Sequence, residues 1–278
     1  MNTSKVWYVT GASRGLGLSL VKRLLADGYR VAATSRSGRD LQEAAGVSDP
    51  SRLLALEVDL TNADAIRRSI EQTVATFGTV DVIVNNAGYG MEGTVEELDE
   101  KQMRDIFEIN VFATINVTKY ALPYLRRQRS GHIINLSSVA GFVGAPGWSI
   151  YSATKSAVLA FSEVLALDLR ELGIKVTVVG PSGFRTGFLT NDSLVSTESQ
   201  IADYQAVAST QARYAAMNGK QDGDPEKAAA LFIQIAENPE PPLHLWLGAN
   251  ALDRAGEKIE SMRQELIKWK DLSVAADF

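Results

Sequence analysis

The feature that most constrains this chain is a glycine-rich turn between an apolar run and a helical segment near its start. Lys5–Thr10 (KVWYVT) is rich in β-forming residues and suits a strand buried on both faces. The turn reads T-G-A-S-R-G-L-G from Thr10 to Gly17, and Leu18–Asp27 then has apolar residues at helical spacing. A strand, a glycine turn and a helix in this order predict a nucleotide site, with the pyrophosphate at the helix N-terminus. The alternative is a purely structural turn.

Each glycine of this turn has a predicted use. Gly11 allows the tight turn, Gly15 lets backbone N–H groups come close to a pyrophosphate, and Gly17 lets the helix pack on the strand. The spacing G-x-x-x-G-x-G is weak evidence by itself. It gains weight because a strand precedes it and a helix follows it.

The end of the second expected strand, Arg30–Thr34, predicts which dinucleotide binds. Folds that bind NAD often place an Asp or Glu here for the ribose 2′-hydroxyl, but this chain has Ser35 and Arg36. A guanidinium matches the oxygens of a 2′-phosphate, and Arg14 in the glycine turn adds a second positive charge. We therefore expect NADP(H) rather than NAD(H). The alternative is that both arginines are solvated surface residues.

Strand-like runs alternate with helical segments through the rest of the chain. The further runs are Leu53–Val58, Val80–Asn85, His132–Leu136, Lys175–Val179 and Leu243–Leu247. This alternation predicts a doubly wound parallel α/β sheet flanked by helices, in a single domain over residues 1–278. Residues 184–224 are polar and show no strand pattern, so they form either a substrate loop or lid or a peripheral helical insert. Residues 249–278 form a C-terminal helical extension, with a mixed-charge helix over Ala249–Lys270.

Polar loops follow two of these strands. Asp59 comes just after the third strand, where its carboxylate accepts a hydrogen bond from an adenine amino group or belongs to an ordinary turn. Asn86-Ala87-Gly88 follows the fourth strand, and such a small-residue turn suits a backbone that lies against a ligand. Its alternative is a simple strand-to-loop turn.

Helix-capping patterns mark three further helix starts. They are Thr61-x-x-Asp64, Asp99 with Gln102, and Asp224-Pro225. The helix that Asp99 caps is expected to run to about Arg127, and Asn110 lies inside it among apolar residues. A buried amide needs a partner, so Asn110 either bends the helix or holds a water.

Ser138, Tyr151 and Lys155 form a candidate catalytic group. Residues i and i+4 of a helix share a face, so Tyr151 and Lys155 are expected to project side by side. A free phenol has a pKa of roughly 10, and a nearby ammonium favours the phenolate and lowers that pKa. A tuned Tyr is then a general acid or base, and the Ser138 hydroxyl holds the reacting oxygen. The alternative is an ordinary amphipathic helix that carries a Tyr and a Lys.

Composition excludes several classes of site. The 278 residues include no Cys, so disulfides, Cys-ligated zinc and thiol nucleophiles are impossible. The chain has only two histidines, His132 and His244, and they are far apart in the sequence, so we expect no metal site. A net charge of −5 argues against nucleic-acid and anionic-membrane partners. No apolar run appears long enough to span a bilayer and no signal-peptide pattern opens the chain, so a cytoplasmic protein is the default expectation.

Taken together, the motifs resemble those of the short-chain dehydrogenase/reductase family. The matching segments are Thr10–Gly17, Asp59, Asn85–Gly88 (NNAG), Asn110, Ser137–Gly141 (SSxxG), Tyr151–Lys155 (YxxxK) and the segment from Pro181 to Thr186. They follow the family's order and spacing, and the joint match is specific although each piece is not. The resemblance implies a Rossmann-type sheet ordered 3-2-1-4-5-6-7. It also implies hydride transfer between a nicotinamide and an alcohol or carbonyl.

The resemblance also implies a role for each matching residue. Tyr151 is the proton donor and acceptor, Ser138 orients the substrate oxygen, Lys155 binds the nicotinamide ribose and lowers the Tyr151 pKa, and Asn110 supports a relay water. The expected cofactor-binding residues are Gly11, Ser13, Arg14, Gly15, Leu16, Gly17, Ser35, Arg36, Asp59, Leu60, Asn86, Ala87, Gly88, Tyr151, Lys155, Pro181, Gly183 and Thr186. One departure is Ser182, where the family commonly has Gly, and it puts the local backbone contact to nicotinamide in question.

The expected function is an NADP(H)-dependent carbonyl reductase or alcohol dehydrogenase. One alternative is a redox sensor that binds the dinucleotide without chemistry, although such proteins typically lack the Tyr or the Lys. A second is a reductase of carrier-bound acyl chains, for which the sequence shows no basic entrance patch in residues 184–224. Relatives commonly form dimers or tetramers, so we expect a homo-oligomer. The C-terminal extension either covers that surface or contributes to it.

Overall fold

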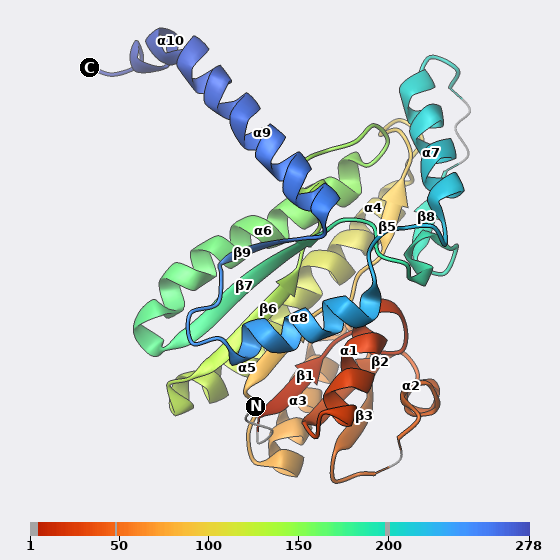
Figure 1. Cartoon of the computed structure of the whole chain (residues 1–278), viewed down its shortest axis with the longest axis vertical. Coiled ribbons are helices and arrows are strands. Elements are labelled where there is room, and N and C mark those ends of the chain that lie inside the picture. The colour runs from red at the N-terminus through yellow and green to blue at the C-terminus, as the bar shows by residue number, and fades with distance from the viewer. Residues whose placement is uncertain (1–4, 48, 198–200) are drawn as a thin grey trace.

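A seven-stranded parallel sheet forms the centre of the molecule (Figure 1). The computed structural model describes residues 5–47, 49–197 and 201–278. The strands of this sheet are β1 (Val6–Val9), β2 (Arg30–Ser35), β3 (Leu53–Glu57), β4 (Val82–Asn85), β6 (Gly131–Leu136), β7 (Ile174–Pro181) and β9 (His244–Leu247). Their order is β3-β2-β1-β4-β6-β7-β9, and every pair is parallel. The predicted sheet and its 3-2-1-4-5-6-7 order are confirmed.

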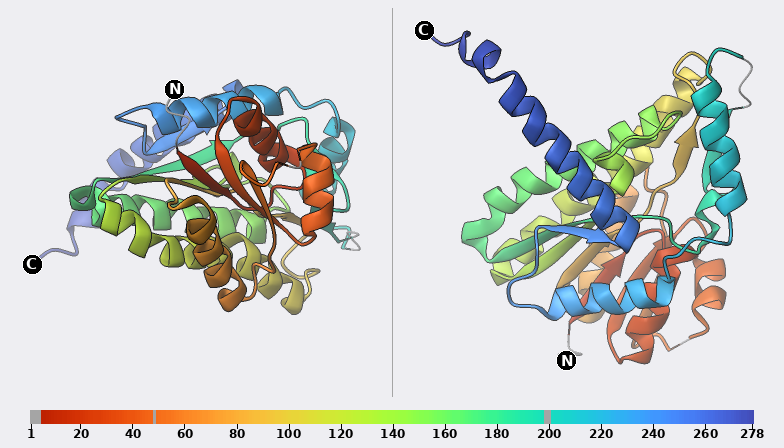
Figure 2. Two further views of the ribbon diagram at one scale, coloured as in Figure 1. Left: turned by 90° about the horizontal axis from the view of Figure 1, so that it is seen from below. Right: turned by 45° about the horizontal axis from the view of Figure 1, so that its top comes forward.

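Helices cover both faces of the sheet (Figure 2). One face packs against α1 (Gly15–Ala26), α2 (Gly38–Ala45) and α8 (Pro225–Glu237). The other packs against α3 (Ala63–Phe77), α5 (Ala113–Gln128) and α6 (Ser149–Leu169). The sheet is therefore the middle of three layers, with one hydrophobic core on each side.

Burial on both faces explains why β1 is apolar throughout. Trp7 and Val9 pack into the core beneath α1 and α8, whereas Val6 and Tyr8 pack into the core beneath α3 and α5. All four side chains are fully buried. Burying a large apolar side chain contributes about 1.5–3 kcal/mol, so every residue of this strand favours the folded sheet.

The helix boundaries confirm most of the capping predictions. The carboxylates of Asp99 and Asp224 accept hydrogen bonds from backbone N–H groups at the starts of α4 (Glu100–Phe107) and α8. The capping box at Thr61 is wrong, because Asn62 is the N-cap of α3 and its Oδ1 accepts from Ala65 N at 3.0 Å. Thr61 instead donates its hydroxyl proton to Asp59.

The long helix that contains Asn110 changes its pitch around this residue. A five-residue π-helical turn, Glu108–Phe112, joins α4 to α5 without a break in the chain's helical course. A π turn inserts one extra residue per turn and is frequent at functional sites. The long helix predicted from Asp99 is thus present with a π turn around Asn110, whose side chain is buried there.

Two strands outside the main sheet correct the description of residues 184–224. β5 (Gly90–Glu92) pairs in parallel with β8 (Leu194–Ser196), although we expected no strand in that segment. Each strand has only three residues, so neither is long enough to show a period. The same segment contains the helix α7 (Gln205–Met217), which lies beside β8 (Figure 1).

One helix is longer and more apolar than the sequence analysis allowed. The stretch Ser149–Leu172, which comprises α6 and the turn after it, reaches a mean hydropathy of 1.2 over a window long enough to span a membrane. It packs along β7 in the second core, where Leu165 and Leu169 are buried. Only a third of this window is buried, and Val164 and Leu167 on its other side are exposed.

His132 is a buried imidazole at the start of β6. Its Nε2 lies 2.9 Å from Thr177 Oγ1, and Thr177 donates its own hydroxyl proton to the carbonyl of Pro242. Nε2 must therefore carry the proton that His132 donates to Thr177, which is the arrangement of a neutral imidazole. Burial, with the charges of Lys5 and Lys175 adding to it, lowers the pKa of His132 to about 3.

This burial predicts a loss of stability on mild acidification. An unfolded imidazole takes up a proton below its ordinary pKa of about 6.5, while the folded one stays neutral, so protons favour the unfolded chain from pH 6.5 down to about 3. Between pH 7 and pH 5 this group should lower the free energy of unfolding by about 2 kcal/mol. Urea unfolding at both pH values measures the effect.

The two imidazoles of the chain supply a matched control. His132→Gln keeps a donor for Thr177 and should remove this part of the pH dependence. His244→Gln should keep it, because the side chain of His244 is partly exposed beside Glu163. Full retention of the pH dependence in the His132 variant would contradict the assignment.

Candidate active site

A cleft of about 1130 Å³ opens at the carboxyl ends of the parallel strands. The loops after β1, β2, β3, β4, β6 and β7 all contribute to its walls. This is where ligands bind in open α/β sheets. Every predicted catalytic and cofactor-binding residue lines the cleft except Gly17 and Asn110, which lie behind its wall.

The glycine turn after β1 has a backbone that side chains would obstruct. Gly11 and Gly15 have φ angles of +64° and +56°, in the left-handed region. A Cβ at Gly11 would lie 2.8 Å from Ala87 Cα, and a Cβ at Gly17 would lie 2.5 Å from Gly11 O. The N-terminus of α1 has no side-chain cap and faces the cleft. An uncapped helix N-terminus beside such a cradle fits the pyrophosphate of a dinucleotide.

The loop after β4 supports this turn from the opposite side. Asn86 Nδ2 donates to the carbonyls of Thr10 and Gly11, at 2.8 and 3.0 Å. The backbone N–H groups of Asn86 and Ala87 both donate to Thr10 Oγ1 at 3.0 Å. The amide of Asn86 therefore braces the glycine turn, while Asn86, Ala87 and Gly88 present their other surface to the cleft.

The end of β2 places a cation and a carboxylate at the same rim. Arg36 is exposed and lines the cleft, and Ser35 Oγ hydrogen-bonds with the backbone of Ser37. Asp40 also lines this rim, and the sequence analysis missed it because it lies in a helix after the strand end. Arg14, in the glycine turn, also lines the cleft, and its Nη2 donates to Asp192 O at 2.6 Å.

Ser138, Tyr151 and Lys155 meet at the floor of the cleft. Tyr151 and Lys155 occupy adjacent turns of one face of α6 and are 5% and 4% exposed. Lys155 Nζ lies 5.9 Å from the centroid of the Tyr151 ring and donates to Leu136 O at 2.8 Å. The side chain of Ser138, just past β6, lies beside the Tyr151 hydroxyl and acts to lower its pKa. A proton donor and a second hydroxyl thus point at one position.

The pKa of Tyr151 moves in the opposite direction from the prediction. Burial raises it to about 12, and only the side chain of Ser138 acts to lower it. Burial likewise lowers the pKa of Lys155 to about 8, and no carboxylate among the described residues forms an ion pair with it. Desolvation disfavours the charged form of both groups. The predicted lowering of the Tyr151 pKa by Lys155 is therefore outweighed by burial in this structure.

Asn110 connects the catalytic helix to the loop after β4. Its Oδ1 accepts from Tyr89 N, and its Nδ2 donates to Tyr89 O and to Thr154 Oγ1, at 3.0 to 3.1 Å. Thr154 in turn donates to the carbonyl of Tyr151. The side chain of Asn110 is thus fully engaged in positioning Tyr151 and the Gly88 segment.

The departure at Ser182 is accommodated by a second glycine. Ser182 N donates to Leu247 O at 3.0 Å, which continues the pairing of β7 with β9. Its side chain points toward Gly248, where a Cβ would lie 2.5 Å from Ser182 Oγ. Gly248 has a φ angle of +98°. Pro181 and Gly183 line the cleft on either side, as does Thr186 at the start of the following turn.

An aromatic wall beside Tyr151 was not predicted. The ring of Trp148 lies 5.4 Å from that of Tyr151 and 4.9 Å from that of Tyr214, and Phe188 lies 5.9 Å from Tyr151. Tyr214 comes from α7 and Phe188 from the segment before β8. The contacts of Trp148 with Tyr214 and of Tyr151 with Phe188 join residues more than thirty positions apart, so no local pattern identifies them.

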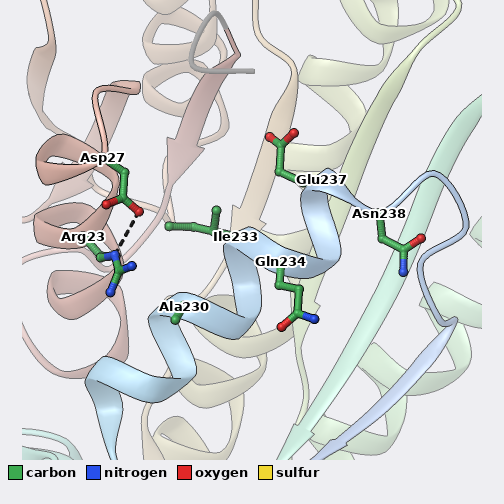
Figure 3. Close-up of a pocket in the computed structure, with 7 residues that line it drawn as sticks. All are labelled: Arg23, Asp27, Ala230, Ile233, Gln234, Glu237 and Asn238. Atoms are coloured by element: carbon green, nitrogen blue, oxygen red, sulfur yellow. Dashed lines mark hydrogen bonds and ion pairs between the residues drawn. The ribbon is translucent and has the colours of Figure 1, made fainter. Parts of the chain in front are cut away.

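A smaller hollow of about 470 Å³ lies between α1 and α8 (Figure 3). Arg23 and Asp27 form an ion pair of 2.8 Å at its edge. Asp27 comes just before β2, so this hollow lies near the amino ends of the strands. The cleft lies at the opposite edge of the sheet, where the strands have their carboxyl ends. It contains none of the predicted residues and is not a candidate active site.

Comparison with known proteins identifies the family. The family model described as short chain dehydrogenase matches residues 5–195. Oxidoreductase BOA17 of Botryotinia fuckeliana is 35% identical over 98% of this chain and 99% of its own, and 3-ketodihydrosphingosine reductase of Bacteroides thetaiotaomicron is 33% identical over 88% of each. The crystal structure of a short-chain dehydrogenase from Streptomyces avermitilis superposes with a TM-score of 0.90, at 36% identity and full coverage of both chains. The chain therefore belongs to the short-chain dehydrogenase/reductase family of oxidoreductases, whose cofactors are NAD(H) and NADP(H).

Proposed function

We propose that the protein transfers a hydride between NADP(H) and a carbonyl or secondary alcohol, with Tyr151 as general acid and base. The observation that carries this proposal is the meeting of Ser138, Tyr151 and Lys155 at the floor of the cleft that the glycine turn also lines. Nucleotide-binding backbone and proton-transfer side chains thus share one cavity. A site that only senses the dinucleotide has no need of the second group.

The side chains divide the work of carbonyl reduction. Tyr151 Oη gives its proton to the substrate oxygen, and the hydroxyl of Ser138 donates a hydrogen bond to the same atom. A bound nicotinamide supplies the hydride in this direction and accepts it in the reverse one. Lys155 would bind the ribose hydroxyls of the nucleotide, and its ammonium would balance the charge left on the tyrosine after proton transfer. Asn110 keeps the backbone of Tyr151 in place through Thr154.

The protonation state of Tyr151 suits a proton donor. With a pKa raised to about 12, the phenol is protonated throughout the neutral range. Reduction uses this form directly. Alcohol oxidation needs the phenolate. Below the pKa, the fraction of phenolate rises about tenfold for each unit by which the pH increases.

The walls of the cleft favour a substrate with an apolar body. Trp148, Tyr214 and Phe188 surround the position that Tyr151 addresses. Aromatic rings at such distances bind flat or aliphatic groups through area burial and edge contacts. A small polar carbonyl compound would leave these faces uncovered. A carrier-bound acyl chain would fill the wall as well, so the screen below includes one.

Removal of the Tyr151 hydroxyl tests the catalytic role. Tyr151→Phe keeps the ring in the aromatic wall and removes the proton, so kcat should fall about 10²- to 10⁴-fold. Binding of NADPH, measured by fluorescence titration, should be retained. Steady-state kinetics on a panel of ketones, secondary alcohols and an acyl-carrier substrate give the comparison.

Tyr214→Phe is the matched control for this variant. It removes a hydroxyl from the same wall without touching the proposed donor, so its kcat should stay near that of the wild type. Near-normal turnover by Tyr151→Phe would refute the assignment. Wild-type protein that binds NADPH and turns over nothing on the panel would favour a sensing role.

The direction of the Tyr151 pKa predicts opposite pH profiles for the two directions. Alcohol oxidation should speed up by about tenfold per pH unit between pH 7 and pH 9, because the phenolate is the minor form there. Carbonyl reduction should change little over the same range. Initial rates in both directions on one substrate pair measure this difference. A flat profile for oxidation under conditions where the chemical step limits the rate would exclude Tyr151 as the base.

Cofactor choice tests the role of Arg36. A charge-assisted contact with the 2′-phosphate should give about 10- to 100-fold higher kcat/KM with NADPH than with NADH. Ser35→Asp with Arg36→Ala should erase or invert this preference, since the carboxylate repels phosphate and accepts from ribose hydroxyls. Arg39→Ala on the exposed side of α2 removes the same charge outside the cleft and should leave the preference unchanged. Equal kcat/KM for both cofactors in the wild-type protein would contradict the proposal.

A further inference from the structure

The C-terminal helix leaves the body of the molecule. α9 (Ala249–Lys268) starts directly after β9, and its first turns pack on the body through Ala251 and Ala255, which are buried. From Ile259 onward every residue is exposed, and α10 (Lys270–Val274) continues the extension. All three views show this helix projecting away from the sheet and its covering helices (Figures 1 and 2).

One side of this helix carries a continuous apolar stripe. We define the α9 stripe as Leu252, Ala255, Ile259, Met262, Leu266 and Trp269. The spacing alternates between three and four residues, which is the heptad pattern of helices that pair along their length. Ala255 is covered by the body, whereas Ile259, Met262, Leu266 and Trp269 are 42–73% exposed.

Such a stripe needs a covering partner. An amphipathic helix gains most of its stability by burying its apolar face against another element. The projecting half of α9 packs on nothing within the described residues. A contiguous apolar face of this kind marks an interaction site.

The charged residues beside the stripe favour an antiparallel copy of the same helix as the partner. Lys258 and Glu265 flank it on one side, seven residues apart, and neither forms an ion pair within the described part of the chain. When two such helices pair in opposite directions, Lys258 of each copy faces Glu265 of the other, which makes two attractive contacts. In a parallel pair Lys258 faces Arg263, where like charges repel, and Glu265 faces Lys270, where opposite charges attract, so these charges give the parallel arrangement no net gain.

We propose that the α9 stripe binds the α9 stripe of a second copy of this chain, with the two helices antiparallel. The stripe and its flanking charges are self-complementary when two copies are antiparallel, as an interface on a two-fold axis requires. This inference does not depend on the substrate or on the cofactor. It assigns the C-terminal extension to assembly, and it makes the number of chains in the particle even.

The interface adjoins the active site through the base of the same helix. Asn250 and Arg254 line the cleft, and Arg254 Nη2 donates to Val143 O at 3.0 Å. Val143 belongs to the segment between Ser138 and Tyr151. A second copy that holds the outer half of α9 therefore also fixes one wall of the cleft.

Light scattering after size-exclusion chromatography tests the interface. The wild-type protein should contain an even number of chains, and Leu266→Lys should halve that number while keeping the far-UV spectrum and NADPH binding. Gln264→Lys is the matched control, because it adds the same charge to the opposite side of the helix and should leave the mass unchanged. Unchanged mass in Leu266→Lys, or a wild-type monomer at tens of micromolar, would overturn the proposal.

Charge reversal tests the direction of pairing. Lys258→Glu should weaken association about tenfold, because two attractive contacts become repulsive, and Lys258→Glu with Glu265→Lys should restore it. A parallel pair would instead be strengthened by Lys258→Glu, which would overturn the antiparallel arrangement. Wild-type protein that stays a single chain and sediments with vesicles of phosphatidylcholine and phosphatidylglycerol would assign the stripe to a lipid surface and overturn pairing altogether.

Discussion

The burial of a parallel sheet on both faces is the constraint on which the rest of this structure depends. Helices cover both faces, so most strand residues are buried, and β1 is apolar along its whole length. Backbone and polar groups become accessible only where the strands end. Because all strands of the main sheet run in one direction, their carboxyl ends meet at one edge. The cleft, its glycine turn and Ser138 are consequences of that shared edge.

The same burial sets the electrostatics of the active site. Tyr151 and Lys155 lie on the inner face of α6, and desolvation moves the pKa of each toward the neutral form. The ammonium of Lys155 has the carbonyl of Leu136 as its acceptor. A ligand that brings hydroxyl oxygens to Nζ would favour the charged form, and this charge would in turn favour the phenolate of Tyr151. Under the proposed function, cofactor binding and proton transfer would be coupled through this one buried ammonium.

Local patterns in the sequence predicted the main sheet, because each strand is an apolar run bounded by turn residues and each helix has caps or glycine stops nearby. They also predicted the residues of the glycine turn, which depend on backbone conformation at a few neighbouring positions. They did not predict β5 and β8, which have three residues each and pair across about a hundred positions. The sequence patterns did not predict the contact between the rings of Trp148 and Tyr214 either, because these residues are also far apart in the chain. Asn62 rather than Thr61 caps α3, and the Thr61 hydroxyl donates to Asp59 instead.

The pKa of Tyr151 shows why a motif alone does not fix the chemistry. The spacing of Tyr151 and Lys155 correctly places both on one helix face, but the free energy of each charged form depends on how much water the surrounding fold excludes. Trp148 and Phe188, whose rings lie within 6 Å of the Tyr151 ring, come from loops outside the motif. The base of α9 closes another wall of the cleft through Arg254. The dielectric environment of the phenol is thus set by segments on both sides of the motif, and the base of the C-terminal extension is one of them.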